Sequence, residues 1–439
     1  MSSETKKQYK AHHITNIRYP YAKTWDRRNS HVEFEIANCA YPMVNAIRRL
    51  MISSVKTVGF RTEPYNACDI TVKVNDTPLH NQIVLHRLAM VPINISKPES
   101  FDVDDYLFII DVSNNTNSII DITTEHFSIK QISTNKMLSR DEVKKFFPPE
   151  SNTGDYILID KLRPKYFTPS KHVSSKVASE MSKEFNKLAT GDDIMRFHIE
   201  GKASISNGAE NGHYSPVSCA SYINTIDPEK AAFGLKEYID KQIDIAKLKN
   251  VAHMTLEQLT RRFELTERAR FFYTNDKEEP NVFTFKIESV DSIIPPLIIF
   301  NRAIDILKDK IAKFISNLVS KNDKVITIRP SDKLDGGYDL IVKDEDDTLG
   351  NIIQSHLCLL YADYSLSKEQ RKLKFIGYKK PHPLENHIIF AIQGQTENLE
   401  ELINDIVKPG CAEIIKMLNK IQHEIEETHQ FVNELKHIS

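Results

Sequence analysis

The chain has 439 residues, with 58 lysines and arginines against 60 aspartates and glutamates, which gives a formal net charge of -2 at pH 7. A chain of this length is long enough for two or three domains, each with its own hydrophobic core. Because the charges nearly cancel, no overall positive field draws the chain to nucleic acid, and a primary DNA- or RNA-binding protein is disfavoured.

Neither a secretory signal nor a membrane span is expected. The polar start at residues 1–10 lacks the apolar centre of a signal peptide, and apolar runs such as Ile293–Phe300, which two prolines interrupt, are much shorter than a bilayer span. We therefore expect a soluble intracellular protein. The cysteines stand singly among apolar neighbours and predict reduced core thiols without a disulfide framework: Cys39, Cys68, Cys219, Cys358 and Cys411.

The first elements are a strand hairpin and a helix. Residues 14–18 form a short extended run, and the alternation of apolar and charged residues over 32–36 predicts a half-buried strand that pairs with it. Pro42 suits the first turn of the helix that follows, because proline needs no intrahelical donor there. Apolar residues then recur at helical spacing: Val44, Ile47, Leu50, Met51 and Val55. Arg48 and Arg49 fall largely off that apolar stripe.

Residues 62–222 differ in character and predict an inserted, mainly β domain. Strand patterns cover 70–74, 106–112 and 196–205, and a helix is expected over 79–89. The next segment, 223–280, turns helical between Asp227 and Thr274 and predicts a helical connector. A strand at 282–290 and a helix opened by Pro295 and Pro296 then follow within 281–320.

The last part of the chain, 321–439, repeats the pattern of the first. Residues 32–55 align without a gap on 338–361, which places Asn45 on Asn351, Ile47 on Ile353 and Met51 on Leu357. Shorter matches pair Ile17-Arg18 with Ile328-Arg329, 58–61 with 376–379, and Phe285 with Phe390. A second long helix is expected from about Leu399 towards Phe431. Two small sheets, each with helices on it, predict an α+β fold in which the two units pair within one chain.

Several motifs resemble a known family. The segments 45–53 (NAIRRLMIS), 79–93 and 214–222 resemble, in order, motifs of the α-like subunits of multisubunit RNA polymerases, which comprise bacterial α, its archaeal D-type homologue and the eukaryotic third subunit. The segments 347–351, 375–378 and 381–383 are similar to the small α-like partner, which is the archaeal L-type protein or the eleventh subunit of RNA polymerase II. The chain therefore resembles a fusion of the two partners, a trait of large cytoplasmic DNA viruses, and only about 223–280 is unmatched.

The resemblance implies two α-like dimerisation units in an α+β chain. The first would comprise 1–61 and 281–320, interrupted by the inserted domain at 62–222, and the second would comprise 321–439. It implies a non-catalytic assembly platform that docks the second-largest and largest polymerase subunits together with small polymerase subunits, in the host cytoplasm and the virion if the source is viral. No cofactor, no membrane and no direct contact with nucleic acid are expected.

Six residues are candidates for these contacts. Packing of the two like helices predicts an interface between the repeats formed by Ile47, Met51, Ile353 and Leu357. Arg48 and Arg49 can be a solvated helix face, but a guanidinium is also suited to carboxylates of a partner, and the resemblance favours docking to a large subunit.

Two alternatives to an assembly subunit are a metal-dependent enzyme and a DNA-binding module. Convergent carboxylates at Asp102, Asp104 and Asp105, or at 344–347, could hold magnesium. We expect the first cluster to lie in a solvated loop and the second to lie at a helix N-terminus, where negative charge is favoured.

Zinc has little support in the spacing of candidate ligands. His80 and His86 lie six residues apart, unlike the close pairs of zinc sites, and Cys68 has no cysteine near it. The family often carries a cysteine cluster in its inserted domain, but no cysteine stands between Ile93 and Cys219. No catalytic or metal-binding residue is therefore assigned.

Overall fold

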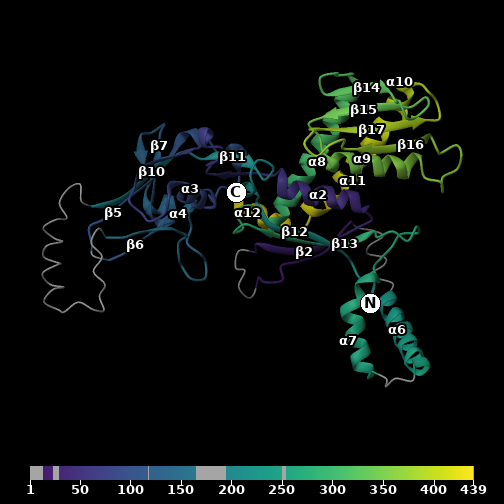
Figure 1. Cartoon of the computed structure of the whole chain (residues 1–439), viewed down its shortest axis with the longest axis horizontal. Coiled ribbons are helices and arrows are strands. Elements are labelled where there is room, and N and C mark those ends of the chain that lie inside the picture. Colours follow the sequence, from purple (N-terminus) through teal and green to yellow (C-terminus); the bar gives the residue numbers. More distant parts are fainter. Residues whose placement is uncertain (1–12, 23–28, 117, 165–193, 250–253, 439) are drawn as a thin grey trace.

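The computed structural model describes residues 13–22, 29–116, 118–164, 194–249 and 254–438. Figure 1 shows an inserted domain at one end of the molecule, a first sheet at its centre and a second sheet beyond it, with a helical hairpin that projects from the first sheet. Among the described residues, no helix is long and apolar enough to cross a membrane.

The first sheet has four antiparallel strands in the order β1-β2-β13-β12. These are β1 (Ile14–Arg18), β2 (His31–Ala37), β13 (Val282–Ser289) and β12 (Val217–Asn224). Its helices are α2 (Tyr41–Ser53) and α8 (Pro296–Val319), each with a proline in its first turn. Prolines suit that position because the first backbone amides of a helix have no intrahelical acceptor.

The second sheet has the same strand order, β14-β15-β17-β16. Its strands are β14 (Ile326–Pro330), β15 (Tyr338–Lys343), β17 (His387–Gly394) and β16 (Leu373–Lys379). Its helices are α9 (Asp347–Tyr361), a continuous run of α10 (Leu399–Glu401), the π-helical η7 (Leu402–Val407) and α11 (Lys408–Glu426), and finally α12 (His429–Ile438). The predicted α+β class and internal repeat are confirmed.

Strand register supports the repeat residue by residue. Phe285 lies opposite Phe34 in the first sheet, and Phe390 lies opposite Leu340 in the second, as the sequence alignment predicts. The match of Arg18 with Arg329 also holds, because they face Glu33 and Asp339. The first pairing is irregular between residues 15 and 18, where Asn16 has a φ of 55°.

The predicted match of 58–61 with 376–379 is wrong. Strand β3 (Lys56–Gly59), which follows α2, leaves the first sheet and pairs with β11 (Ser204–Asn207) beside the inserted domain. The chain thus enters the insertion directly after α2, and a match of four residues is too short to reveal that change of direction.

Strand β12 is the true counterpart of β16. Tyr222 lies opposite Phe285 as Tyr378 lies opposite Phe390. The expected boundary of the inserted domain at residue 222 therefore falls inside a strand of the first sheet. The edge strand of the first unit comes from the far side of the insertion, which no local pattern indicates.

The inserted domain contains a five-stranded sheet in the order β4-β10-β5-β7-β8. Its strands are β4 (Ile70–Asn75), β10 (Met195–Gly201), β5 (Tyr106–Asn114), β7 (Phe127–Gln131) and β8 (Lys136–Met137), and a separate ribbon pairs β6 (Ile120–Thr123) with β9 (Leu158–Leu162). Its helices are α3 (Asn81–Ala89) and α4 (Arg140–Phe146). Its separate core includes Phe60, Phe108, Phe127, Phe147 and Phe197.

The predicted strand at 196–205 is two strands, because the chain turns after Gly201. A Cβ at Gly201 would lie 2.8 Å from the carbonyl oxygen of Asp69, so only glycine allows this approach.

Short 3-10 helices occur at η1 (Tyr65–Ala67), η2 (Pro98–Ser100), η3 (Val103–Asp105), η4 (Thr124–His126), η5 (Gly212–Tyr214) and η6 (Arg268–Arg270).

The expected helical connector forms a hairpin of α6 (Pro228–Lys249) and α7 (Leu256–Thr266) between β12 and β13. Phe263 of α7 packs near Tyr238 and Phe271, which closes the hairpin with aromatic contacts. In the second unit, β16 and β17 are joined by residues 380–386 alone.

One hydrophobic core serves both sheets. Helix α2 packs against α8 and α9, and α11 packs against α8 and α9, so the four helices lie between the two sheets (Figure 1). Buried residues from both units belong to a single cluster, whereas the inserted domain has its own. The amphipathic helices of each unit therefore bury their apolar faces partly against the other unit.

Candidate partner-docking site

The four residues predicted to lie between the repeats are all in the shared core. Ile47 and Met51 on α2, and Ile353 and Leu357 on α9, are each at most 1% exposed and belong to the same cluster. Helix α2 packs directly on α9, and the four side chains lie on these two helices. Each buried aliphatic side chain contributes on the order of 1.5 to 3 kcal/mol.

Arg49 reaches across the junction to the second unit. One of its terminal nitrogens lies 3.1 Å from Oδ2 of Asp346, and the two side chains are 41% and 46% exposed. Asp346 is also the N-cap of α9, where it accepts a hydrogen bond of 2.9 Å from the backbone amide of Thr348. The expectation that the carboxylates at 344–347 stand at a helix N-terminus is confirmed for this residue.

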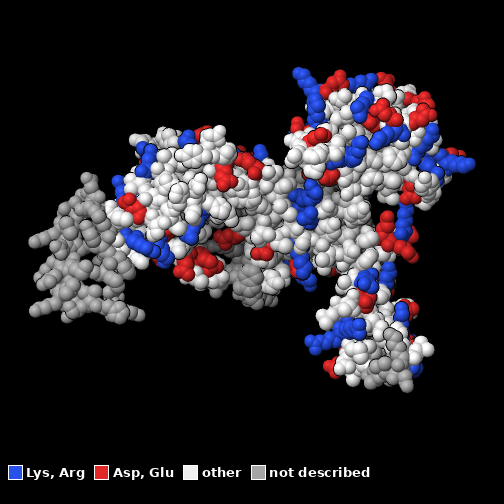
Figure 2. All heavy atoms as spheres, in the orientation of Figure 1, with Lys and Arg blue, Asp and Glu red and all other residues white. Residues whose placement is uncertain are grey.

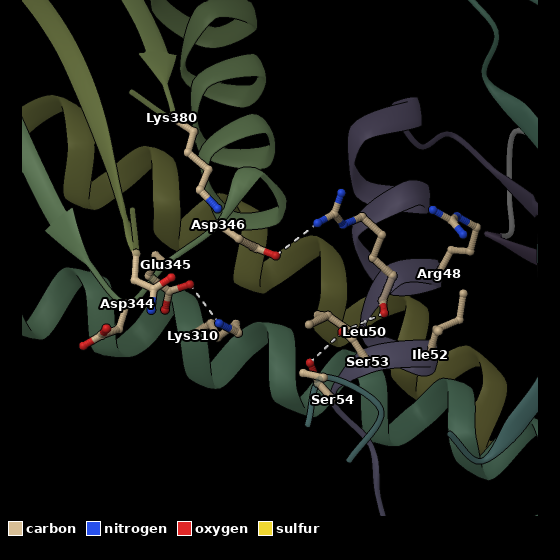
Figure 3. Close-up of a pocket in the computed structure, with 13 residues that line it drawn as sticks. Arg48, Leu50, Ile52, Ser53, Ser54, Lys310, Asp344, Glu345, Asp346 and Lys380 are labelled. Carbon is tan, nitrogen blue, oxygen red and sulfur yellow. Dashed lines mark hydrogen bonds and ion pairs between the residues drawn. The ribbon is translucent and has the colours of Figure 1, made fainter. Parts of the chain in front are cut away.

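Arg48 has different surroundings from its neighbour. Its Nε donates to Oδ1 of Asn45 at 2.9 Å, and no carboxylate of the described chain pairs with it. Figure 3 shows Arg48 directed away from Asp346. Arg48 therefore retains donors for a partner, while Arg49 shares its charge with the second unit.

A cleft of about 560 Å³ opens beside these arginines (Figure 3). Its lining comes from both units and from the insertion: Arg48, Arg49, Leu50, Ile52, Ser53, Ser54, Ala209, Lys310, Asp344, Glu345, Asp346, Lys380 and Asn386. Both positive and negative groups line it, and no nucleophile with an adjacent base lies among these residues. The lining thus offers charged and polar groups from three parts of the fold.

Two neighbouring carboxyls in the cleft have opposite pKa shifts. Burial raises the pKa of Glu345, and its 2.8 Å pair with Nζ of Lys310 only partly offsets this. Burial also acts on Asp346, but hydrogen bonds from Thr348 and the charge of Arg49 outweigh it, so the pKa of Asp346 is lowered. Asp346 is thus the stable anion at the junction.

Polar contacts from the C-terminal helices also join the units, and the sequence contained no signal for them. Glu424 of α11 accepts from the backbone amides of His13 and Ile14, at 2.6 and 2.9 Å. Glu434 of α12 likewise accepts from backbone amides at the start of α8. Both contacts link residues far apart in the chain, so no local spacing predicts them.

Glu434 is 5% exposed and takes the place of an N-cap for α8. It accepts from the amides of Leu297 at 2.9 Å and Ile298 at 3.3 Å, and from the hydroxyl of Tyr19 at 2.6 Å. Burial raises the pKa of Glu434 to about 7, although these three hydrogen bonds act to lower it.

The other acidic cluster does not gather around an open cation site. Asp102 caps the 3-10 helix at 103–105, Asp104 pairs with Lys202, and Asp105 accepts from Gln131 and Ser133. The last two hydrogen bonds lower the pKa of Asp105. The expected solvated loop is therefore tied at Asp105 to the end of β7 and to the turn that follows it. In the part of the chain that the structure describes, no three His, Cys, Asp or Glu residues are grouped to hold a metal.

The cysteines and histidines considered for zinc have separate surroundings. His80 caps α3 by accepting from the amide of Gln82, while His86 is exposed. All five cysteines are free thiols, and burial raises the pKa of Cys39 and of Cys411 to about 12. Cys219 is exposed on edge strand β12, so the expectation of a core thiol is wrong there. The pairing of β12 with β13 is irregular between Val217 and Cys219, where Ser218 and Cys219 are both exposed, and the apolar neighbours did not indicate this.

Two protein-family models with the same description match separate parts of the chain. The RNA polymerase Rpb3/Rpb11 dimerisation domain matches residues 33–311, and a second family of that description matches 338–424. The first range contains β12, β13 and most of β2, and the second contains β15, β16 and β17, whereas the first strand of each sheet, β1 or β14, lies before the match. The first match spans the inserted domain and the helical hairpin.

Individual relatives are distant. The chain is 25% identical to a conjugation stage-specific protein of Tetrahymena thermophila over 45% of this chain and 56% of that protein. It is 29% identical to the DNA-directed RNA polymerases II, IV and V subunit 3 of Arabidopsis thaliana over 20% of this chain and 25% of the relative. A probable RNA polymerase II subunit RPB11 of Plasmodium falciparum is 27% identical over 25% of this chain and 78% of its own length.

The chain spans about half the length of the Tetrahymena relative and a quarter of the Arabidopsis one, at 56% and 25%. The matches to subunit 3 and to RPB11 nevertheless agree with the two units seen in the fold. With the family match over more than half of its residues, the chain belongs to the RNA polymerase Rpb3/Rpb11 dimerisation-domain family and contains two such domains.

Proposed function

We propose that this chain is a non-catalytic assembly-platform subunit of a DNA-directed RNA polymerase. The observation that supports this most is the presence of two dimerisation domains of equal strand order whose helices share one core. Relatives named as subunit 3 and as RPB11 match, which is consistent with both partner types in one chain. The chain contributes a surface to the polymerase and no side chain to nucleotide addition.

The two domains act as an intramolecular heterodimer. The contacts of Glu424 and Glu434 with the first unit, together with the Arg49–Asp346 pair, support this arrangement. Linking the partners gives an effective concentration of roughly millimolar for a short connection and keeps their ratio at one to one. A platform of this kind needs no separate dimerisation step before large subunits dock.

Arg48 and Arg49 form the candidate docking site for a large polymerase subunit. Arg48 has unpaired donors, Arg49 is half exposed, and Ile52 beside them adds exposed apolar surface. Arginine next to apolar surface is typical of residues that dominate binding energy at protein interfaces. The second-largest subunit is the expected first partner, and the largest subunit follows.

A pull-down of the second-largest subunit with an Arg48→Ala/Arg49→Ala double variant tests this. Thermal stability should stay nearly unchanged, because exposed arginines contribute little to folding. Capture should weaken by about 2 kcal/mol or more, since charge-assisted contacts buried on binding are lost. Undiminished capture would show that these arginines are only a solvated face.

Two controls sharpen the test. Arg261→Ala/Arg262→Ala on α7 removes the same charge from exposed positions elsewhere and should leave capture intact. Asp346→Ala releases Arg49 from its cross-unit pair and separates docking by free arginine from docking by the preformed pair.

Co-purification of both large subunits with the unmodified chain tests the proposed class itself. A magnesium-dependent activity, or DNA retention that falls steeply with salt, would favour the alternatives. The viral source, with host cytoplasm and virion as location, stays a prediction.

A further inference from the structure

A strongly basic segment lies on the second unit although the whole chain is nearly neutral. Residues 368–380 contain six lysines and arginines and a single acidic residue, Glu369. The cations are Lys368, Arg371, Lys372, Lys374, Lys379 and Lys380. Figure 2 shows lysine and arginine side chains over the region where Figure 1 places β16 and the loop before it. Overall charge therefore conceals a local positive surface.

These cations are not neutralised by the chain itself. In the ranges that the structure describes, no carboxylate forms an ion pair with any of the six. Arg371 donates to the carbonyl oxygen of Tyr364 and stacks on its ring at 4.9 Å, and Lys372 lies 5.9 Å from the ring of Tyr361. Positive charge that is held by neutral partners remains available to an anionic ligand.

Strand β16 is also a free sheet edge. It is the last strand in the order β14-β15-β17-β16, and within the described residues its backbone hydrogen-bonds only with β17. Ile376 is buried and Tyr378 packs on Gly350 of α9, so this face is occupied. Phe375, which is 44% exposed, lies over Gly377 on the other face. The outer edge and the Phe375 face remain open.

Protection against aggregation explains only part of this composition. Lysines on an edge strand hinder unwanted pairing, and Lys374 and Lys379 suffice for that. The other four cations lie outside the strand, before it and after it. The corresponding edge strand β12 of the first unit carries no charged residue at all. A second reason for the charge is therefore needed at β16.

We propose that β16 binds an extended acidic polypeptide segment, which adds to the sheet as a further strand with its carboxylates on the flanking lysines. An unpaired strand edge recognises a peptide backbone and not a nucleic acid, and this favours a protein ligand. Five of the six cations are lysines, which act as point charges without the planar geometry of base recognition.

The surface is continuous with the cleft beside Arg49, because Lys380 at the end of β16 lines that cleft. The inference rests on the proposed function only for the identity of the protein that carries the segment, namely a polymerase subunit that is docked at the cleft. The chemistry of the segment follows from β16 and the cations that flank it.

The test uses the purified full chain and a fluorescent peptide of about ten residues that alternates glutamate and valine, without any polymerase subunit. Binding should weaken with salt, and Lys374→Glu/Lys379→Glu should weaken it at least about tenfold. Lys408→Glu/Lys420→Glu, exposed on α11 of the same unit, makes the same charge change and should have little effect. Circular dichroism checks that both variants are folded.

Two further probes separate the explanations. A peptide with N-methyl groups along one backbone edge keeps its charge but cannot pair, and equal binding of this peptide would overturn strand addition. Equal or tighter binding of an oligothymidylate of similar charge would overturn selectivity for a protein segment. Absence of peptide binding would refute the inference while leaving the Arg48/Arg49 pull-down valid. Failure of the unmodified chain to capture any polymerase subunit, together with positive peptide binding, would instead count against the polymerase role alone.

Discussion

Adjacent residues can have unlike roles because successive side chains on a helix point about 100° apart. Ile47 faces the core, Arg48 faces solvent beside Asn45, and Arg49 meets Asp346 of the other unit. The apolar spacing predicts the first of these environments. The carboxylate that meets Arg49 comes from 297 positions further along the chain, so only the fold identifies it.

Glu434 makes the stability of the chain depend on pH. Its pKa is raised from an ordinary 4.5 to about 7, so the folded chain binds this proton more tightly than the unfolded chain does. The stabilisation is complete below the unfolded pKa and is lost as pH rises through about 7. This single group should therefore lower stability between mildly acidic and neutral pH, by up to about 3 kcal/mol.

Glu434→Gln should remove that dependence. Glutamine can still accept from the amides of Leu297 and Ile298 and can donate to the hydroxyl oxygen of Tyr19, but it carries no charge. Denaturant unfolding should give similar stabilities for the two proteins near about pH 5, and the variant should become relatively more stable towards about pH 8. A constant difference across this range would mean that Glu434 does not titrate there.

At the level of elements, the two units are alike in topology but not in their contacts. Asp346 caps α9, whereas the residue before α2 is Ala40, whose side chain cannot accept a hydrogen bond. Ser355 stands on α9 where Arg49 stands on α2, so the ion pair at the junction exists on one side only. This asymmetry gives the paired units two different faces, and only one of them carries the candidate docking arginines.

The contact between α2 and α9 should be essential to the fold. An Ile47→Asp/Met51→Asp variant loses two buried side chains, worth on the order of 1.5 to 3 kcal/mol each, and buries carboxylates at further cost. Thermal unfolding should show a large loss of stability or separate transitions of the two units. Ile352 and its neighbours on α9 pack in the same core, so Ile353→Asp/Leu357→Asp should behave alike.

Ile52→Asp is the matched control on the same helix, because its side chain is 36% exposed. It should leave the melting temperature nearly unchanged. If the core variants melted like this control, the arrangement of α2 on α9 would be wrong.

At the scale of the whole molecule, the shared core predicts that the connection between the units is not needed for their association. A protease site inserted between Asp323 and Lys324, in the turn after α8, should be cleaved without separation of the halves. The cleaved chain should elute from a sizing column as one species, because the apolar faces of both units remain buried together. Two separate species would show that the covalent link holds the units together.

The helical hairpin α6–α7 projects from the body of the molecule (Figure 1), and its base is tied to the second unit by the ion pair of Lys277 with Asp363. The aromatic contacts of Phe263 give it a small cluster of its own. The connector is therefore a distinct substructure between two strands of the first sheet, where the second unit has only a short link.

The repeat, the α+β class, the two amphipathic helices and the capping carboxylate before α9 can all be predicted from the amino-acid sequence. These depend on local spacing, since helical and strand periodicities and cap residues act within a few positions of one another. The tertiary structure alone decided that β12 and not β3 completes the first sheet, that Asp346 holds Arg49, and that Glu434 caps α8. The last two contacts join residues 297 and 137 positions apart, and β12 pairs with β13 across the helical hairpin. Such contacts are selected by packing and burial after the local elements have formed.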